Sequence, residues 1–320
     1  MNSFNIVQPL DNQATINAWQ QATQRIFTPS QNRYFSDGFA AAGLQAGRRR
    51  PQWCWQALDA SGQQLGFIAA QGPTEGEDPA PYILDVFDLP EQHPEIAAAL
   101  LSAAADSVRQ RYQLGEFELV VKTPVSETPS KDLPVIAQAA TAAGFRLLVE
   151  RRSYLCVKAD GTFQPCTTEL HFDQLSTADR SRLSTLHQAL LQGSLDAHHL
   201  EGLKHHSPAE VSEEELSYML QDGIESFRIA VDRQGNDVGL LVAARWSEVR
   251  GALAFVGVHP DFRGNGYAAQ LAAWATELLF QSGVEEIVAD TDMSNIPMAA
   301  AFQKVGYPQL ESRVDWIKRW

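Results

Sequence analysis

The segment Val256-Gly-Val-His-Pro-Asp-Phe-Arg-Gly-Asn-Gly-Tyr-Ala-Ala-Gln-Leu271 decides the fold of this 320-residue chain. A predicted strand over 252–258 leads through a turn with Gly264 and Gly266 to a predicted helix that begins at Tyr267. The N–H groups that open a helix lack partners within it, and the helix dipole adds about half a positive charge there. Glycines let an anion approach these amides. The segment therefore predicts a strand–loop–helix anion site, although its spacing matches neither a P-loop nor a dinucleotide fingerprint.

An internal repeat extends this pattern to the whole chain. Residues 57–70 align without gaps with residues 230–243, with five identities, where about one is expected by chance. Both segments have the pattern of a β-hairpin with an Asp/Gly turn. Further along, Gly144 and Gly306 each follow a predicted helix, at a position where positive φ favours glycine. The repeat predicts two copies of one domain.

Each copy also contains one long predicted helix, over 94–112 in the first and 267–280 in the second. The element order in each copy is then β-β, strand, helix, strand, helix, strand. We expect an α/β (α+β) chain of two tandem domains, each a mixed central sheet flanked by helices. Their predicted bounds are 1–162 and 168–320.

Composition and charge limit the classes of function. The formal net charge is −14 with a pI near 5.0, which argues against nucleic acid because phosphate binding needs a basic face. The one basic run, Arg48-Arg49-Arg50, predicts a solvated turn before a strand. No apolar run approaches the roughly 20 residues that cross a bilayer, and the N-terminus lacks the features of a secretory signal. With three cysteines in no recognisable pattern, we expect a cytoplasmic protein without membrane contacts.

The opening segment resembles motif A of the GNAT acetyltransferase family, Gln/Arg-x-x-Gly-x-Gly/Ala after a strand that ends in Val-x-Pro. In that family the loop amides bind the pyrophosphate of CoA, and the splayed strand pairs with the pantetheine. The resemblance implies that Val256 and Val258 offer backbone groups to the acyl-pantetheine arm, with the oxyanion held near Val258. It also implies a pyrophosphate loop made of Arg263, Gly264, Asn265, Gly266, Tyr267 and Ala268. Asp261 stands at the Gln/Arg position, so this side chain supplies no positive charge there.

Residues 295–307 resemble motif B of the same family, Asn-x-x-Ala-x-x-x-Tyr-x-x-x-Gly-Phe. The resemblance places Asn295 and Phe302 beside the CoA arm. Phe302 replaces the Tyr that often protonates the leaving thiolate, so Ser294, Tyr307 or a water would serve as the acid. Unassisted departure is the other possibility, since a thiol with a pKa of about 8.5 is a tolerable leaving group.

An amine must lose its proton to attack a thioester, and alkyl ammonium groups titrate near pH 10, so the site needs a base or a desolvated pocket. The family often uses a Glu on the strand before motif A, or a water chain, but residues 252–258 contain no acid. The candidates are Glu248, Asp290 and Asp292, for which turn and capping roles are the competing interpretation.

Four histidines lie in the connection between the first two helices of the second domain, where the resemblance places the acceptor pocket: His198, His199, His205 and His206. One of them could serve as the base. Their spacing matches no metal motif, so we expect no metal. For His259, which precedes Pro260, we expect a local structural role.

The first copy has Asp88-Leu-Pro-Glu-Gln-His-Pro-Glu95 in place of the glycine loop, and its acids would oppose a pyrophosphate. It therefore resembles a degenerate GNAT domain. The resemblance implies acetyl transfer from acetyl-CoA to an amine of a small molecule or peptide (an N-terminus or lysine), by direct attack in a ternary complex. Acyl transfer to oxygen and longer acyl chains remain open. The main alternative is a non-catalytic acyl-CoA-binding or sensor module, favoured by Phe302 and the missing strand Glu. We expect a monomer or homodimer.

Overall fold

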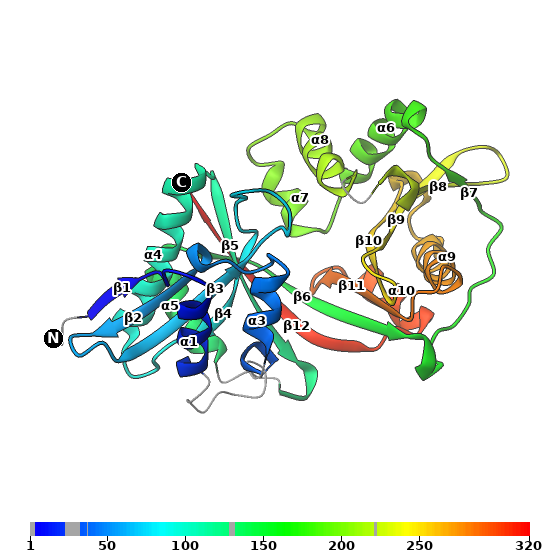
Figure 1. Ribbon diagram of the computed structural model, residues 1–320. Coiled ribbons are helices and arrows are strands. Elements are labelled where there is room, and N and C mark those ends of the chain that lie inside the picture. The colour runs from blue at the N-terminus through cyan, green and yellow to red at the C-terminus, as the bar shows by residue number, and fades with distance from the viewer. Residues whose placement is uncertain (1–3, 23–32, 37, 128–131, 221–222) are drawn as a thin grey trace. The chain divides into compact units, whose positions relative to one another are not determined.

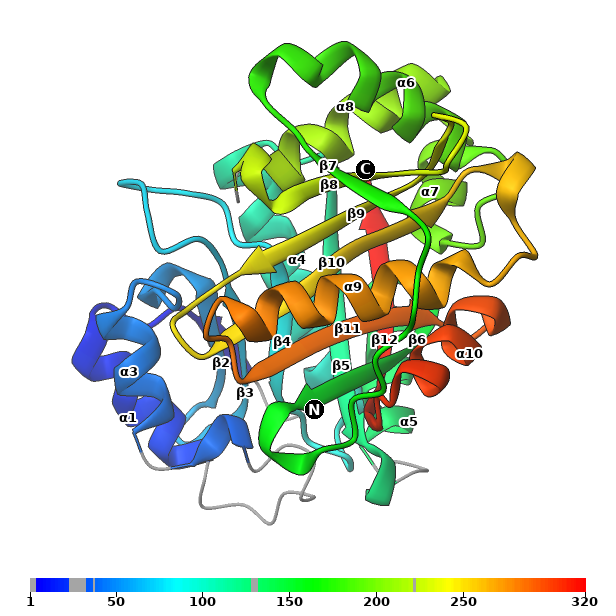
Figure 2. The same ribbon diagram turned by 90° about the vertical axis from the view of Figure 1, so that its right-hand side faces the viewer.

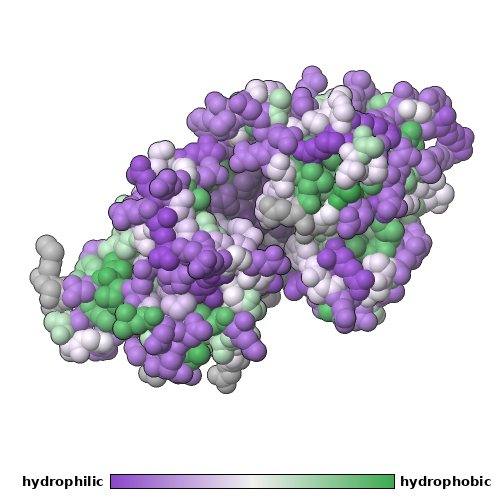
Figure 3. All heavy atoms as spheres, turned by 45° about the horizontal axis from the view of Figure 1, so that its top comes forward, coloured by the Kyte–Doolittle hydropathy of each residue, from purple (hydrophilic) through white to green (hydrophobic). Residues whose placement is uncertain are grey.

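The computed structural model describes residues 4–22, 33–36, 38–127, 132–220 and 223–320 (Figure 1). Contacts divide the chain into two units, the first formed by Met1–Val149 with Arg313–Trp320 and the second by Glu150–Ser312. On the face shown in Figure 3, hydrophilic residues cover most of the surface. Among the described residues, no helix combines the length and the apolar character needed to cross a membrane.

The first unit is a mixed sheet with helices on both faces. Its strands are β1 (Phe4–Val7), β2 (Cys54–Asp59), β3 (Gln64–Gln71), β4 (Ile83–Asp88) and β5 (Glu116–Pro124). They lie in chain order in the sheet, with β4 and β5 parallel. The helices are α1 (Asn12–Ala22), α3 (Phe39–Gln45), α4 (Pro94–Tyr112) and α5 (Leu133–Ala142).

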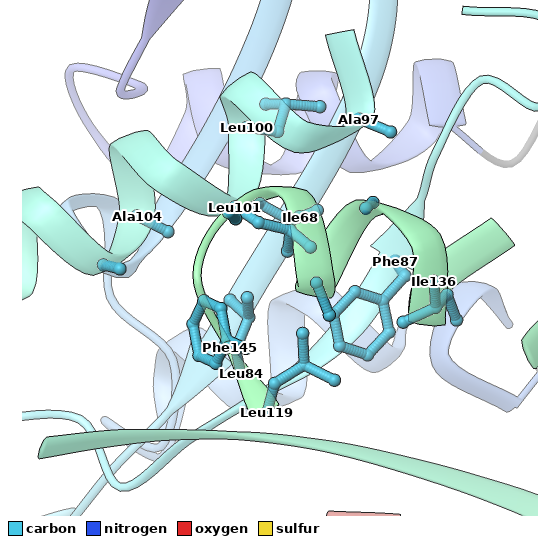
Figure 4. Close-up of a cluster of buried hydrophobic side chains, with 14 of the residues drawn as sticks. Ile68, Leu84, Phe87, Ala97, Leu100, Leu101, Ala104, Leu119, Ile136 and Phe145 are labelled. Atoms are coloured by element: carbon cyan, nitrogen blue, oxygen red, sulfur yellow. The ribbon is translucent and has the colours of Figure 1, made fainter. Parts of the chain in front are cut away.

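Alternation along β3 divides the first unit's core between the two faces of the sheet. Ile68 and Ala70 belong to the cluster under α4 and α5, whereas Phe67 and Ala69 pack with the residues of α1 and α3. Successive side chains of a strand point to opposite faces, which produces this division. Figure 4 shows the first cluster, where leucines of α4 lie beside Ile68 of the sheet.

The second unit repeats this plan. Its strands include β7 (His171–Gln174), β8 (Phe227–Val231), β9 (Asp237–Arg245), β10 (Arg250–Val258) and β11 (Glu286–Asp292), in the sheet order β11-β10-β9-β8-β7. Its helices are α6 (Arg180–Leu191), α7 (Ala197–Gly202), α8 (Pro208–Met219), α9 (Tyr267–Gln281) and α10 (Ile296–Val305). Figure 2 shows α9 along one face of β9, β10 and β11. Leu241 belongs to the cluster on the α9 side and Leu240 to the cluster with α6 and α8, so helices cover both faces.

The hairpin turns confirm the internal repeat at atomic detail. Asp59 Oδ1 accepts the N–H groups two and four residues later at 2.8 and 2.9 Å. Asp232 Oδ1 does the same at 2.9 and 2.8 Å. The glycines between them, Gly62 and Gly235, have φ of 83° and 85°. Gly144 and Gly306 likewise take positive φ, 83° and 87°, as predicted.

The last strand of each repeat serves the other unit's core. β6 (Arg146–Val157) ends the first repeat, but its second half pairs with β11 and buries Tyr154 in the second unit. β12 (Gln309–Arg319) ends the second repeat, yet Val314 and Trp316 lie in the core of the first unit. The predicted bounds 1–162 and 168–320 follow the repeats along the sequence and remain a prediction. The units defined by contacts differ from them, because most of β12 belongs to the first unit and most of β6 to the second.

The prediction of a solvated turn at Arg48-Arg49-Arg50 is wrong for its central residue. Arg49 is buried, and its guanidinium donates two hydrogen bonds to the buried carboxylate of Asp85, at 2.5 and 2.8 Å. A buried cation without a counter-charge is costly, so Asp85 on β4 is what permits the burial. A local charge run cannot reveal a partner 36 residues away.

Candidate active site

Strand β10 separates from its parallel neighbour after its first three residues. It pairs with β11 over Arg250–Ala252 and with β9 over its whole length, with a register shift between Leu253 and Phe255. This irregularity is a β-bulge, which bends a strand and redirects its side chains. Within the described residues, no pairing with β11 continues beyond Ala252, so one edge of β10 is free over its second half.

Along the free edge, alternate residues direct their backbone groups away from β9, and of these the Val258 carbonyl accepts Arg263 Nε at 3.0 Å. His259 N–H donates to Val238 O on β9 at 2.8 Å, which fixes the direction of the ladder. Because alternate residues of an antiparallel strand direct their N–H and C=O groups to opposite sides, those of Val256 and Val258 point away from β9. These are the two residues that the sequence resemblance assigns to the acyl-pantetheine arm.

The loop after β10 has the form expected of an anion site. A single 3₁₀ turn, η8 (Pro260–Phe262), leads to Gly264 and Gly266, whose φ angles are 83° and 76°. A Cβ built on either glycine would meet nothing within 4 Å, so the space beside both is open. Gly266 is the N-cap of α9, and the N–H groups of the first turn face that space without helical partners.

The other loop residues have distinct local roles. The side chain of Asn265 donates to Phe262 O at 3.1 Å and so stabilises the turn. Tyr267 and Ala268 open α9 and pack, partly buried, against the core. His259 Nδ1 accepts the N–H of Asp261 at 3.4 Å, which confirms the local structural role expected for this histidine.

Arg263 ties the loop to α6 through its side chain. The guanidinium donates to the carbonyls of Leu190, Gln192 and Gly193 at 2.8 to 3.1 Å. Its Nε donates to Val258 O at 3.0 Å. The side chain thus holds the C-terminal end of α6 against the end of β10, a role that the sequence did not indicate.

The motif B residues lie at the start of α10 and in the core. Asn295 is the N-cap, and its Oδ1 accepts the N–H of Met298 at 3.2 Å. Phe302 is buried against Tyr154 and Tyr307, with ring centroids 4.9 and 5.4 Å away. Ser294 is exposed in the turn before α10. Asn295 and Ser294 therefore lie at the surface of this turn, while Phe302 is part of the core.

Tyr307 is not placed to protonate a leaving group. It is 2% exposed, and its hydroxyl shares a hydrogen bond of 2.6 Å with Thr276 Oγ1 of α9. Burial raises the pKa of this phenol well above its usual value, despite the hydrogen bond from Thr276. The placement favours Ser294 or a water as the donor over Tyr307.

The three carboxylates considered as bases have different surroundings. Glu248 is exposed in the β9–β10 turn, and the nine residues of β10 separate it from the loop by roughly 30 Å at about 3.3 Å a residue. Asp292 is buried, bound to Arg151 Nε at 2.9 Å and to Ala197 N–H at 2.6 Å. Burial raises the pKa of Asp292, and the charge of Arg151 opposes this shift. Only Asp290 is exposed on the strand beside the free edge of β10.

The histidines of the predicted acceptor region differ sharply. His205 and His206 are exposed, and His198 Nδ1 lies 2.7 Å from Arg151. His199 is buried: its Nε2 lies 2.7 Å from Glu215 Oε2, and its Nδ1 lies 2.7 Å from Ser194 Oγ.

A further histidine, which the sequence analysis missed, belongs to the same cluster. His187 of α6 is fully buried, with Nε2 3.3 Å from the same Glu215 oxygen and Nδ1 2.9 Å from Ser212 Oγ. Although burial opposes ionisation, the hydrogen bonds from His187 and His199 lower the pKa of Glu215 to about 2. Ligand atoms about 2.0–2.1 Å from a tetrahedral ion would be more than 3 Å apart, so the 2.7 Å contact is that of a hydrogen bond.

Together these features define a class of protein: a tandem of two repeated α/β units, the second with a bulged, splayed strand before a glycine loop and helix, as in acetyltransferases of the GNAT fold. Residues 196–307 match the model of the acetyltransferase (GNAT) family and belong to that family.

Solved structures show the same fold over the full length of the chain. A GCN5-related N-acetyltransferase from Sphaerobacter thermophilus has a TM-score of 0.59 at 15% identity, over 99% of this chain and 95% of that one. A tandem GNAT protein from the clavulanic acid biosynthesis pathway has a TM-score of 0.51 at 14% identity, over 100% and 98%. A glucosamine N-acetyltransferase region of a fungal multi-domain β-N-acetylglucosaminidase has a TM-score of 0.58 at 16% identity, over 99% of this chain and 38% of that one. A search of curated protein sequences finds no match.

The first unit keeps the parallel pair but not the anion loop. β4 pairs with β5 only over Ile83 and Leu84, so the strands also separate there. At the start of α4, Pro94 contributes no N–H, and Glu95 accepts a backbone hydrogen bond that lowers the pKa of its carboxyl group. An internal carboxylate therefore lies at this helix N-terminus, and the degenerate character of the first copy stays a prediction.

Proposed function

We propose that the second unit transfers an acetyl group from acetyl-CoA to an amine, by direct attack in a ternary complex. The observation that carries the proposal is the continuous path formed by the free edge of β10 and the open glycine loop before α9. A pantetheine arm is an extended chain with amide groups, and it would pair with Val256 and Val258 as an added strand does. The pyrophosphate would meet the amides of residues 263–268.

The amides on the free edge also suit the chemistry. Attack on the thioester carbonyl places negative charge on its oxygen, and an N–H group such as that of Val258 would stabilise this charge. The CoA thiolate then leaves and takes a proton from water or Ser294. The acceptor is a primary amine of a small molecule or peptide, which approaches from the side of α6, α7 and α8.

A non-catalytic acyl-CoA module is the second candidate, because Phe302 leaves the site without the usual Tyr donor. Release of free thiol from acetyl-CoA across a panel of amines distinguishes the two. Amine-dependent release supports the enzyme, whereas tight binding without release supports the module.

Calorimetric titration with acetyl-CoA tests the location of the site. Gly264→Glu places a carboxylate in the open space beside the amides, and we expect binding at least about tenfold weaker, or about 1.4 kcal/mol. Gly283→Glu is the matched control, because Gly283 has φ of 94° and open space around it at the other end of α9. Equal affinity in both variants would place acetyl-CoA elsewhere.

A further inference from the structure

Ser194, His199 and Glu215 form a hydroxyl–imidazole–carboxylate chain that none of the roles above uses. Both links are 2.7 Å long. The residues come from the α6–α7 connection, α7 and α8, so the chain exists only because these segments pack together. Ser194 is half-buried, whereas His199 is buried behind it. The hydroxyl is thus the accessible end of the chain.

The contacts of each atom fix the direction of the hydrogen bonds. Glu215 is ionised, so its oxygen accepts and His199 Nε2 carries a hydrogen. In the neutral imidazole, Nδ1 is then the acceptor for the Ser194 hydroxyl. Ser194 Oγ also accepts the N–H of Asp196 at 3.1 Å, which directs its own hydrogen toward His199.

This chain lies beside the second half of β10. The Phe255 ring packs against His187 and His199, with centroids 5.2 and 6.3 Å away. The Arg263 side chain donates hydrogen bonds both to Gly193 O, next to Ser194, and to Val258 O. One guanidinium therefore joins Gly193, the residue before Ser194, to the strand end where the thioester is proposed to lie.

We propose that Ser194 is the group that takes the proton from the attacking amine and passes its own hydroxyl proton to His199, which Glu215 holds in the accepting tautomer. The inference rests on the proposed acetyl transfer and names the base that the sequence left open. Ser194 touches the substrate, while His199 and Glu215 are positioning residues.

The steps balance without a further reactant. The amine nitrogen bonds to the thioester carbon, and its proton moves to Ser194 Oγ as the Ser194 proton moves to His199 Nδ1. The C–S bond breaks, and the CoA thiolate takes up a proton from water. His199 returns a proton to solvent through Ser194, so the products are the amide and the free thiol.

Titratable and charged groups around His199 set the pH at which it accepts a proton. They are Glu215 of α8, His187 of α6, Asp196 and His198 at the start of α7, Arg151 of β6 and Asp292 of β11. Burial opposes protonation of His199, but Glu215 and Asp196 outweigh it, so its pKa is raised above 6.5. Turnover should therefore fall as the pH drops through the pKa of His199.

Steady-state kinetics of four variants test the relay. Ser194→Ala and His199→Gln should lower kcat/KM by about 10²-fold or more, the usual contribution of a general base. Glu215→Gln should move the acidic limb of the pH profile to lower pH. His171→Asn, at an exposed histidine of β7 outside this cluster, is the control and should match the wild type. Measuring the pH profile with two amines of different pKa separates the ionisation of the enzyme from that of the substrate amine.

Acetyl-CoA calorimetry on each variant shows whether the site still folds. Wild-type rates in Ser194→Ala, or an unchanged acidic limb in His199→Gln, would overturn the relay. So would a gain of one acetyl group on Ser194 without amine, because the hydroxyl would then be a nucleophile.

A further readout does not depend on turnover. Nitrogen NMR of His199 should show the hydrogen on Nε2, and the opposite tautomer would refute the relay. Binding of acetyl-CoA without turnover on any amine would reject both the proposed function and this role, whereas turnover with the Nδ1–H tautomer would reject the relay alone.

Discussion

Gly144 and Gly306 occupy similar places in the two repeats, just past the end of a helix, but they meet different surroundings. A Cβ on Gly144 would come no closer than 3.7 Å to Lys318. A Cβ on Gly306 would lie 1.9 Å from Thr162 O. We expect Gly144→Ala to cost the strain of positive φ alone, roughly 1–2 kcal/mol, and Gly306→Ala to cost more because the backbone of residue 162 must move.

Urea unfolding of the two variants measures this difference. The strain of positive φ is common to both, so the excess for Gly306→Ala reports the collision with Thr162. Equal losses of unfolding free energy in the two variants would show that the backbone near residue 162 moves aside without a free-energy cost.

Residue-scale roles at the site were predictable only in part. The glycine spacing predicted Gly264 and Gly266 because a strand, a turn and a helix are local patterns. The partnership of His199 with Ser194 and Glu215 was not, since α7 and α8 must pack before these side chains meet. Glu248 shows the reverse error of local reasoning: it is near the strand in sequence, yet it lies at the wrong end of it.

At the scale of elements, the His199–Glu215 bond joins α7 to α8 and makes this part of the fold depend on pH. In the folded protein the pKa of His199 is raised above its unfolded value of 6.5. The pKa of Glu215 falls from 4.5 to about 2, because its hydrogen bonds with His187 and His199 outweigh the effect of burial. Glu215 stabilises the fold above pH 4.5 and loses this effect as pH falls. His199 stabilises it below 6.5 and loses this effect as pH rises through its folded pKa. The window of greatest stabilisation is therefore between about 4.5 and 6.5.

Glu215→Gln tests this window by urea unfolding across a pH series. The wild type should exceed the variant in unfolding free energy most between about pH 4.5 and 6.5, and the difference should shrink above the folded pKa of His199. A difference that grew steadily toward alkaline pH would show that Glu215 acts by packing or with another partner.

Most elements followed from local sequence. The helix predicted over 94–112 is α4 (Pro94–Tyr112), and that predicted from Tyr267 is α9. Proline at the first helical position and long alanine-rich or apolar periodic runs carry that information locally. The bulge in β10 escaped prediction because it depends on the register with β9.

At the scale of the whole molecule, the exchange of β6 and β12 was not predictable from the repeat. Each repeat ends in the same element, a strand that buries hydrophobic side chains in both copies. Alignment of two copies shows what their elements are, but it does not show which core each strand enters. That choice is made by contacts between residues far apart in the chain, such as Trp316 with the core under α4 and α5.

Removal of Arg313–Trp320 should therefore unfold the first unit rather than the second. The deletion takes Val314 and Trp316 out of the first core, and Arg319 from its bond with Glu116. Truncation of a large buried aromatic side chain to Ala costs about 3–5 kcal/mol. Trp316→Ala should therefore also destabilise the first unit, but less than the deletion does. Hydrogen exchange should show lost protection in β2 and β3 while β9 and α9 keep theirs. Protection lost first in β9 and α9 would mean that the final strand completes its own repeat, and that the exchange of strands does not occur.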